Sequence, residues 1–378
     1  MSATPSPLIL DVRDLVVQYD LPGKSIKALR SVSLRVRRGE VLAVVGESGS
    51  GKSTLGLAIL GLVKKPGTIN GGSILYDNRL DLLKIEREKL REIRGRKISV
   101  IPQDPMTSLN PVKKVRDHFE ELVKAHGSLI PLSSTVGRVD NNHKNQQLAE
   151  EERIKTVFEY VNLPPSALNA YPHELSGGMR QRIMIALALF FGPEVVLADE
   201  PTTSLDVVTE AQILDILKSL QRSERLTMIV FTHNFGVVSR LADRVAVMYA
   251  GNLVEIGELS ELFRAPAHPY TQRLIASIPR LTSTKKELAF IPGFPADLSH
   301  LPSGCAFHPR CAYATQVCEE VVPELRTFQG ASGQGNARNE RLYACHHPLI
   351  GATEQGSSRV IGEAGENTEE NKGVSPGF

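Results

Sequence analysis

The segment GESGSGKS at Gly46–Ser53 follows the apolar run VLAVV and matches the phosphate-loop pattern G-x-x-x-x-G-K-[ST]. Such a loop functions between a buried strand and the start of a helix, where backbone N–H groups face the phosphates. The segment therefore predicts an α/β fold with a mostly parallel sheet and a nucleotide bound at the sheet edge. A glycine-rich turn without a chemical role is the alternative, and the flanking strand and helix patterns argue against it.

Each part of the loop has an expected task. Lys52 is expected to reach the β- and γ-phosphates, and the Ser53 hydroxyl to bind Mg²⁺. The residues that we expect to surround the phosphates are Gly46, Glu47, Ser48, Gly49, Ser50, Gly51, Lys52, Ser53 and Thr54.

The run VVLADE at Val195–Glu200 predicts a buried strand that ends in two acids. Asp199 is placed to hold Mg²⁺ through water, and Glu200 to orient and polarise the water that attacks the γ-phosphate. An isolated Asp-Glu pair at a strand end is commonly only solvated. The phosphate loop in the same chain favours the catalytic role.

Two further apolar runs end in polar residues suited to the same site, namely Gln103 and His233. Ligands of open α/β sheets bind beyond the carboxyl ends of the strands, so we expect these residues to meet the loop and the acids at one edge. A lone histidine is more often structural, but this position favours a γ-phosphate contact for His233. The expected strands are Val41–Val45, Ile98–Ile101, Val195–Ala198, Met228–Phe231 and Val245–Tyr249.

Periodicity and composition divide the chain into three parts. Residues 1–265 are expected to form the α/β domain, opening with alternating segments typical of antiparallel strands and carrying a polar surface insertion at 125–150. Residues 266–350 form a small extension, and residues 351–378, rich in Gly, Ser and Glu, are expected to be disordered. The expected helices follow Lys52, cover Leu80–Ile93, follow Gly178, and run from Val208 to Leu220.

The length of the apolar runs, the N-terminal pattern and the net charge exclude some classes of protein. The longest apolar run, Ile183–Phe191, is far shorter than the roughly 20 residues of a membrane span. The N-terminus lacks the pattern of a signal peptide, so we expect a cytosolic chain. A formal charge of +2 gives no reason to expect a nucleic-acid partner.

The segments GESGSGKS, PQD, LSGGMRQR, VVLADEPTTSLD and FTH follow one another in the order and spacing of the ATP-binding-cassette (ABC) ATPases. Residues 8–265 resemble that family. The resemblance implies a cassette of a mostly parallel sheet, an antiparallel β subdomain and a helical subdomain. It also implies that two cassettes form a head-to-tail dimer with ATP between them, so that the signature loop of one serves the ATP held by the other.

The same resemblance assigns further roles. Tyr19 is expected to stack on adenine, and Asp206, with Ser204 and Leu205, to lie in a loop between the two ATP sites. Mg²⁺ would be held through Ser53, Gln103 and Asp199. The signature loop that faces the partner's ATP comprises Ser176, Gly177, Gly178 and Met179.

The C-terminal segments HPYTQRLIASIP at 268–279 and IPGFPADLSHLPSGCAFHPRC at 291–311 resemble the extension of dipeptide, oligopeptide and nickel importer ATPases. The signature, with Met179, is similar to that of the first of the two unlike ATPase subunits in this group. The resemblance implies a second ATPase, two permeases and an extracytoplasmic substrate-binding protein, with this chain at the cytoplasmic face of the membrane. Peptides are the expected cargo. Oligosaccharides or nickel are alternatives, as is a soluble ABC ATPase outside transport.

All four cysteines lie in the extension, at Cys305, Cys311, Cys318 and Cys345. Their spacing lacks the short C-x2-4-C pair of structural zinc sites. Four thiolates are the ligand set of a [4Fe–4S] cluster, which some importer ATPases of the resembling group carry. Its role would be structural. Buried, unligated thiols are one alternative, and zinc is another, with help from His308, His346 or His347.

Overall fold

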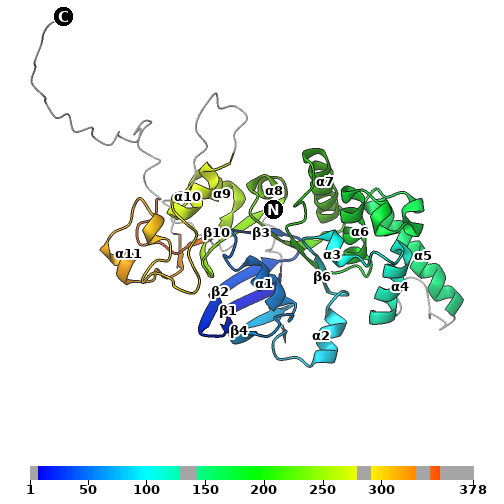
Figure 1. Cartoon of the computed structure of the whole chain (residues 1–378), viewed down its shortest axis with the longest axis horizontal. Helices are drawn as coiled ribbons and strands as arrows, with labels where there is room; N and C mark the ends of the chain where they lie inside the picture. Colours follow the sequence, from blue (N-terminus) through cyan, green and yellow to red (C-terminus); the bar gives the residue numbers. More distant parts are fainter. Residues whose placement is uncertain (1–6, 128–142, 279–290, 329–340, 350–378) are drawn as a thin grey trace, which may run out of the picture.

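The computed structural model describes residues 7–127, 143–278, 291–328 and 341–349. An eight-stranded main sheet crosses the molecule, in the order β11-β12-β10-β9-β3-β8-β7-β6, and a four-stranded sheet in the order β2-β1-β4-β5 lies beside it. Figure 1 places the second sheet below the main one, with helices α3–α6 on the right and the C-terminal segments on the left. Within the described ranges, no helix is long and apolar enough to cross a membrane.

Five neighbouring strands of the main sheet run parallel, as predicted. They are almost wholly apolar and are covered on both faces, which is the usual setting of a parallel sheet. All five predicted strands are confirmed to within one residue at either end. The parallel strands are β3 (Val41–Val45), β6 (Ile98–Ile101), β7 (Val195–Asp199), β8 (Thr227–Thr232) and β9 (Arg244–Tyr249).

The second sheet is antiparallel, as the alternating opening segments predict. Its buried side chains share one hydrophobic core with helix α1 and with part of the main sheet. This shared core fixes the antiparallel sheet against the phosphate loop. Its strands are β1 (Leu8–Leu21), β2 (Lys24–Arg37), β4 (Gly67–Tyr76) and β5 (Leu80–Asp81).

Helices α3–α6 form a helical subdomain next to β6, and α5 packs against α6. The larger core of this side also takes in residues of α7. The helices are α1 (Lys52–Ile59), α2 (Arg87–Ile93), α3 (Pro105–Ser108), α4 (Val115–His126), α5 (His143–Tyr160), α6 (Gly177–Leu189), α7 (Val207–Ser223), α8 (Phe235–Leu241), α9 (Leu259–Arg264), α10 (Pro269–Ala276) and α11 (Gln316–Glu320).

Two expectations need correction. The helix predicted over Leu80–Ile93 begins only at Arg87, because its first residues form strand β5. The Asp81 carboxylate accepts hydrogen bonds from the N–H groups of Ile74 and Leu83, both at 3.2 Å, and this local bonding competes with a helix. The last part of the expected insertion at 125–150 belongs to helix α5. Residues 128–142, and the tail expected to be disordered at 351–378, lie outside the described residues.

Residues 291–328 and 341–349, here called the C-terminal lobe, extend the main sheet. Strand β10 (Asn252–Glu258) pairs antiparallel with β9, β12 (Leu342–Tyr343) pairs with β10, and β11 (Arg326–Thr327) pairs with β12. The guanidinium of Arg341 donates to the buried carboxylate of Glu255 at 2.9 Å. The sequence did not predict that the extension would join the main sheet.

Candidate nucleotide site

The phosphate loop connects β3 to α1, as predicted. Gly51 has a φ of 104°, and a Cβ atom there would lie 2.6 Å from the carbonyl oxygen of Ala28, so the close approach requires glycine. The Lys52 ammonium donates to the carbonyl oxygens of Gly46 at 2.8 Å and Glu47 at 3.0 Å. Burial lowers the pKa of Lys52, which nearby carboxylates oppose. The lysine is thus held inside the loop that it serves.

Asp199, at the end of β7, lies beside the start of α1. The Ser53 hydroxyl donates to its carboxylate at 3.4 Å. Burial raises the pKa of Asp199, and the hydrogen bond from Ser53 opposes this rise. A hydroxyl and a carboxylate are oxygen ligands that Mg²⁺ prefers, so the Ser53–Asp199 pair fits the metal, and Gln103 as a third ligand stays a prediction.

Glu200 follows in a left-handed backbone conformation, with φ of 44°, and its N–H donates to the carbonyl of Phe231 in β8 at 2.8 Å. Such a conformation is costly for a residue other than glycine and is often found at functional sites. The turn brings the Glu200 carboxylate to within 2.7 Å of Nδ1 of His233 and 3.4 Å of the amide nitrogen of Gln103. The strand-end residues therefore do converge on one edge of the sheet.

The pKa of Glu200 is lowered overall. Burial pushes it upward, but the hydrogen bonds from His233 and Thr203 outweigh burial and favour the ionised form. The Thr203 hydroxyl donates to the carboxylate at 2.8 Å. Sequence analysis missed Thr203, although the hydroxyl-bearing run TTS at 202–204, just beyond the acids, was a signal.

The signature loop starts helix α6. Ser176 is its N-cap, and the hydroxyl oxygen accepts the N–H of Met179 at 3.2 Å. A Cβ atom at Gly178 would lie 2.5 Å from the methyl group of Thr209 in α7, so the glycine lets the two helix starts approach. Asp206 caps α7 and accepts the N–H of Thr209 at 2.9 Å. The signature loop and the Asp206 loop are therefore neighbours.

A hollow of about 250 Å³ separates these elements from the loop after β6. Gln103, Gly177, Ser204 and Leu205 are among the residues that line it. The loop that carries Gln103 therefore faces the signature loop across an open space.

Tyr19 lies near the end of β1, opposite Ile26 of β2 and Gly67 of β4. Its half-buried ring packs on the core that also contains residues of α1. The stacking of Tyr19 on adenine stays a prediction from the resemblance.

The four cysteines line one cavity of about 10 Å³, room for about one water molecule. Burial raises the pKa of Cys345 to about 12 and raises the pKa values of Cys305 and Cys311. Among the described residues, no group of three or more His, Cys, Asp or Glu side chains is arranged to hold a metal ion. The structure thus shows no metal centre at these described cysteines, and the iron–sulfur cluster and the zinc ion stay predictions from the sequence.

Comparison with known proteins agrees with this geometry. Residues 29–203 match the family described as "ABC transporter". The dipeptide transport ATP-binding protein DppD of Haemophilus influenzae is 39% identical over 351 residues, which is 92% of this chain and 97% of the relative. The chain belongs to the ABC transporter ATPases. This ABC ATPase also matches the family "Oligopeptide/dipeptide transporter, C-terminal region" over residues 254–318.

Further relatives agree. The oligopeptide transport ATP-binding protein OppD of Bacillus subtilis is 42% identical over 84% of the ABC ATPase and 85% of its own chain. Among solved structures, a bacterial ABC transporter cassette determined as a dimer covers 66% of this chain and 99% of its own, with a TM-score of 0.55 and 27% identity. A second structure captures such a cassette after hydrolysis, bound to ADP and phosphate, with a TM-score of 0.54 and 27% identity. The cassette fold and ATP as its nucleotide are thereby established.

Proposed function

We propose that this ABC ATPase hydrolyses ATP to power the import of peptides through separate permease subunits. Two observations support this proposal most directly. The phosphate loop, Asp199 and the Glu200–His233 pair meet at one sheet edge, and the chain has a C-terminal region of the peptide-transporter type. The relatives named for dipeptide and oligopeptide transport support the peptide cargo.

The proposed chemistry assigns one task to each group. Glu200, ionised and 15% exposed, orients and polarises the attacking water, while His233 beside it contacts the γ-phosphate. Lys52 neutralises charge on the β- and γ-phosphates. Mg²⁺, held by Ser53, Asp199 and Gln103, would neutralise phosphate charge when bound.

The signature loop serves a second ATP site, on a second and unlike ATPase subunit. Helix α6 has no acidic residue in its first turn, so its N-terminus favours an anion. Ser176, Gly177, Gly178 and Met179 would face that partner's γ-phosphate, and Asp206 would link the two sites. The dimeric structure of the related cassette supports this arrangement.

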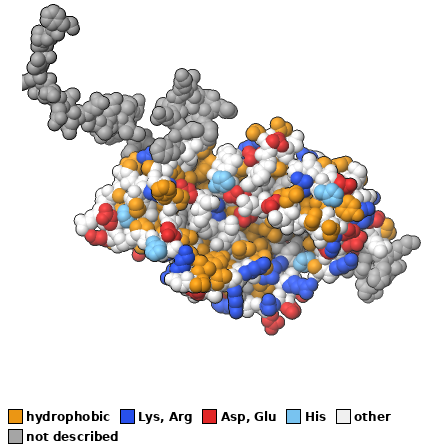
Figure 2. All heavy atoms as spheres, in the orientation of Figure 1, with side chains coloured by type: hydrophobic (Ala, Val, Ile, Leu, Met, Phe, Trp, Pro, Cys, Tyr) orange, Lys and Arg blue, Asp and Glu red, His pale blue; other side chains and the backbone are white. Residues whose placement is uncertain are grey.

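The permeases are proposed to dock beside the loop after Gln103. There, the apolar side chains of Met106 and Val112 are 58% and 79% exposed, and a docked permease would bury them. Figure 2 shows hydrophobic side chains on this face in the region of α3 and α6. Docking would place the chain at the cytoplasmic face of the membrane, with the substrate-binding protein on the other side.

Reconstitution tests the proposal. The chain should be a weak ATPase alone and should gain turnover when a companion ATPase, the permeases and a peptide-loaded binding protein are added in vesicles. Crosslinks from Ser108 to a permease loop would support the docking face. If the isolated chain is already fully active, and added permeases neither bind nor stimulate it, a non-transport ABC ATPase is the better assignment. Uptake of nickel or oligosaccharide but not peptide would correct the cargo alone.

The cysteines form the remaining part of the proposal, as ligands of a [4Fe–4S] cluster. Their side chains line one common cavity, which supports a shared role. In the structure the thiols enclose only about 10 Å³, so a cluster would require them to move apart, and metal binding would release their protons. Iron and sulfide analysis of anaerobically purified protein decides the matter. Colourless protein without iron, with four reactive thiols, would leave plain buried cysteines.

A further inference from the structure

Two sequence segments of the C-terminal region meet on one residue of the phosphate loop. The hydroxyl oxygen of Tyr270, in α10, accepts the backbone N–H of Glu47 at 2.9 Å. The guanidinium of Arg310 binds the Glu47 carboxylate with both terminal nitrogens, at 2.7 and 3.0 Å. The phosphate-loop pattern leaves position 47 free, so phosphate binding alone does not require this acid.

Arg310 is itself held in place. Its side chain is 6% exposed, and its Nε atom donates to the carbonyl of Pro292 at 2.8 Å. Its guanidinium lies 5.9 Å from the ring centres of both Tyr249 and Phe307, and it donates to the Tyr249 hydroxyl at 3.3 Å. Two-pronged, buried arginine–carboxylate pairs are geometrically specific, so Arg310 restrains where Glu47 can lie.

Tyr270 is equally fixed. It is fully buried, and its ring centre lies 4.7 Å from that of Tyr249 and 5.3 Å from that of Phe307. Nδ1 of His268 accepts the Tyr270 N–H at 3.0 Å and so caps α10. The Tyr270 hydroxyl is thereby aimed at the first turn of the phosphate loop by packing.

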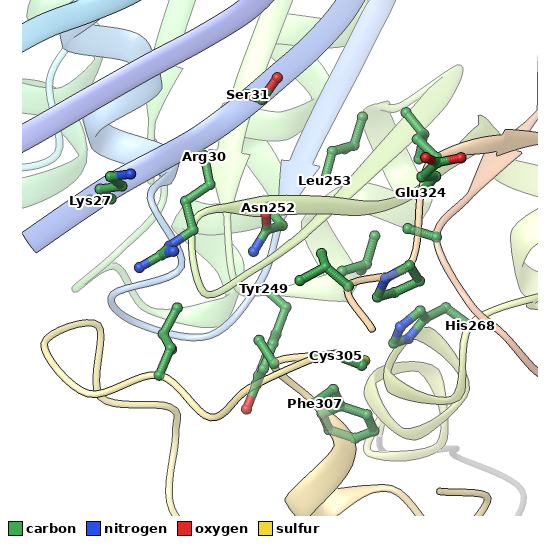
Figure 3. Close-up of a pocket in the computed structure, with 18 of the residues that line it drawn as sticks. Lys27, Arg30, Ser31, Tyr249, Asn252, Leu253, His268, Cys305, Phe307 and Glu324 are labelled. Carbon is green, nitrogen blue, oxygen red and sulfur yellow. The ribbon is translucent and has the colours of Figure 1, made fainter. Parts of the chain in front are cut away.

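Next to this contact, the C-terminal lobe stands away from the antiparallel sheet. A hollow of about 740 Å³ lies between β2, β10 and the lobe. In Figure 3, Lys27 and Arg30 of β2 lie on one side of it, and Tyr249, His268 and Phe307 lie below. The hollow separates this part of the lobe from β2. Near the nucleotide site, the lobe meets the domain through Phe307, which packs with Tyr249 and Tyr270, and through the pair of Arg310 with Glu47.

Glu47 is a point from which the loop can be positioned. Its carbonyl accepts hydrogen bonds from the Lys52 ammonium at 3.0 Å and from the N–H of Ser50 at 3.1 Å. Holding both the N–H and the carboxylate of Glu47 therefore fixes the groups that organise the loop before ATP arrives. A loop organised in advance binds more tightly, because less conformational entropy is lost on binding.

We propose that Tyr270 and Arg310 are positioning residues for ATP, which clamp Glu47 and so hold the phosphate loop in its binding conformation. This inference rests on the proposed ATPase function. It gives the two C-terminal segments a task at the nucleotide, apart from any contact with permeases or cargo.

Titration of the purified full chain with a fluorescent ATP analogue tests the clamp. Arg310→Met should weaken binding about 5- to 10-fold and Tyr270→Phe a few-fold, because each removes a hydrogen bond that orders the loop. In the reconstituted complex, the KM for ATP should rise while kcat stays within about twofold of the parent, since the residues do not touch the reacting atoms. Arg326→Met, an exposed arginine of the same lobe, is the matched control and should bind as the parent does.

Exchanging the charges of Glu47 and Arg310 is the most direct test of the clamp. Glu47→Arg and Arg310→Glu should each weaken ATP binding, and the double exchange should recover much of the loss if the pair acts as a clamp. Arg310→Lys should retain part of the affinity, and melting curves identify any variant that fails to fold. The inference is overturned if Arg310→Met and Tyr270→Phe bind ATP as the parent does, or if the two charge reversals are simply additive. The ATP affinity of the parent, measured first, tests the proposed function. The ratio of variant to parent affinity tests the clamp alone.

Discussion

The nucleotide domain buries most of the residues of its five parallel strands, and two large hydrophobic clusters fill the space on either side of them. The C-terminal lobe, in its described residues, contributes only Phe307, Cys318 and Ala344 to the buried apolar set. It is tied to the domain by the pairing of β12 with β10, by the Arg341–Glu255 and Arg310–Glu47 ion pairs, and by Phe307, which belongs to a hydrophobic cluster shared with β3 and β9. One region is stable through its own core, whereas the other depends on contacts with its neighbour.

The largest expected effect lies in the domain. Glu200→Gln should lower the rate of ATP hydrolysis by roughly 10²–10⁴-fold, because the amide cannot polarise water as the carboxylate does. ATP affinity should be kept, since the phosphate loop is untouched, and binding and phosphate release are measured on the same preparation. Hydrolysis near the parental rate would remove Glu200 from the mechanism. No single change in the lobe is expected to approach this effect on kcat.

The same contrast explains what the sequence could predict. The parallel strands are short apolar runs, and polar residues at their ends carry the chemistry, so local pattern sufficed for β3, β6, β7 and β8. The Arg310–Glu47 pair joins residues 263 positions apart, and no local pattern encodes such a contact. The first half of the helix predicted over Leu80–Ile93 was wrong for a local reason. Asp77 and Asn78, with φ of 51° and 54°, turn the chain so that Leu80 pairs with Tyr76 of β4.

Two buried phenylalanines offer a matched test of the comparison. Phe231 in β8 is 1% exposed and Phe307 in the lobe is 2% exposed. Phe231→Ala should lower the free energy of unfolding of the whole domain by about 3–5 kcal/mol, as large cavities in a core do. Phe307→Ala should instead open the lobe locally and leave the main thermal transition nearly unchanged.

Hydrogen exchange and thermal melting separate these outcomes. Phe307→Ala should speed exchange in the lobe and α10, while protection of β3 and β8 stays as in the parent. If both variants lower the main transition equally, the lobe and the domain unfold as one unit, and the distinction between them fails.

Acid should loosen α10, together with the lobe whose Phe307 lies beside His268, before the rest of the domain. Burial lowers the pKa of His268 to about 3, from the ordinary value near 6.5, so the folded state holds a neutral ring. Between these pH values the unfolded chain binds a proton that the folded state does not, and stability falls as pH falls from 6.5 toward 3. His268→Asn can still cap α10 and does not titrate, so it should flatten this dependence. The readout is the reaction of the lobe thiols with a disulfide reagent active in acid.

The smallest expected effect is the acid titration of Glu194, within the nucleotide domain. Burial raises the pKa of Glu194, but hydrogen bonds from Arg38, Lys97 and Tyr76 outweigh it and bring the pKa to about 2. The folded pKa is therefore below the unfolded value near 4.3, so this stabilisation is complete above pH 4.3 and is lost as pH falls toward 2. The carboxylate is 30% exposed, so solvent screening keeps the effect modest. Measured by circular dichroism, the ellipticity of Glu194→Gln should depend less on pH than that of the parent, and only below pH 4.3. At that pH the lobe thiols of the parent should already be reactive. If thiol exposure and loss of ellipticity follow the same pH curve in the parent, the lobe and the domain instead share a single acid transition.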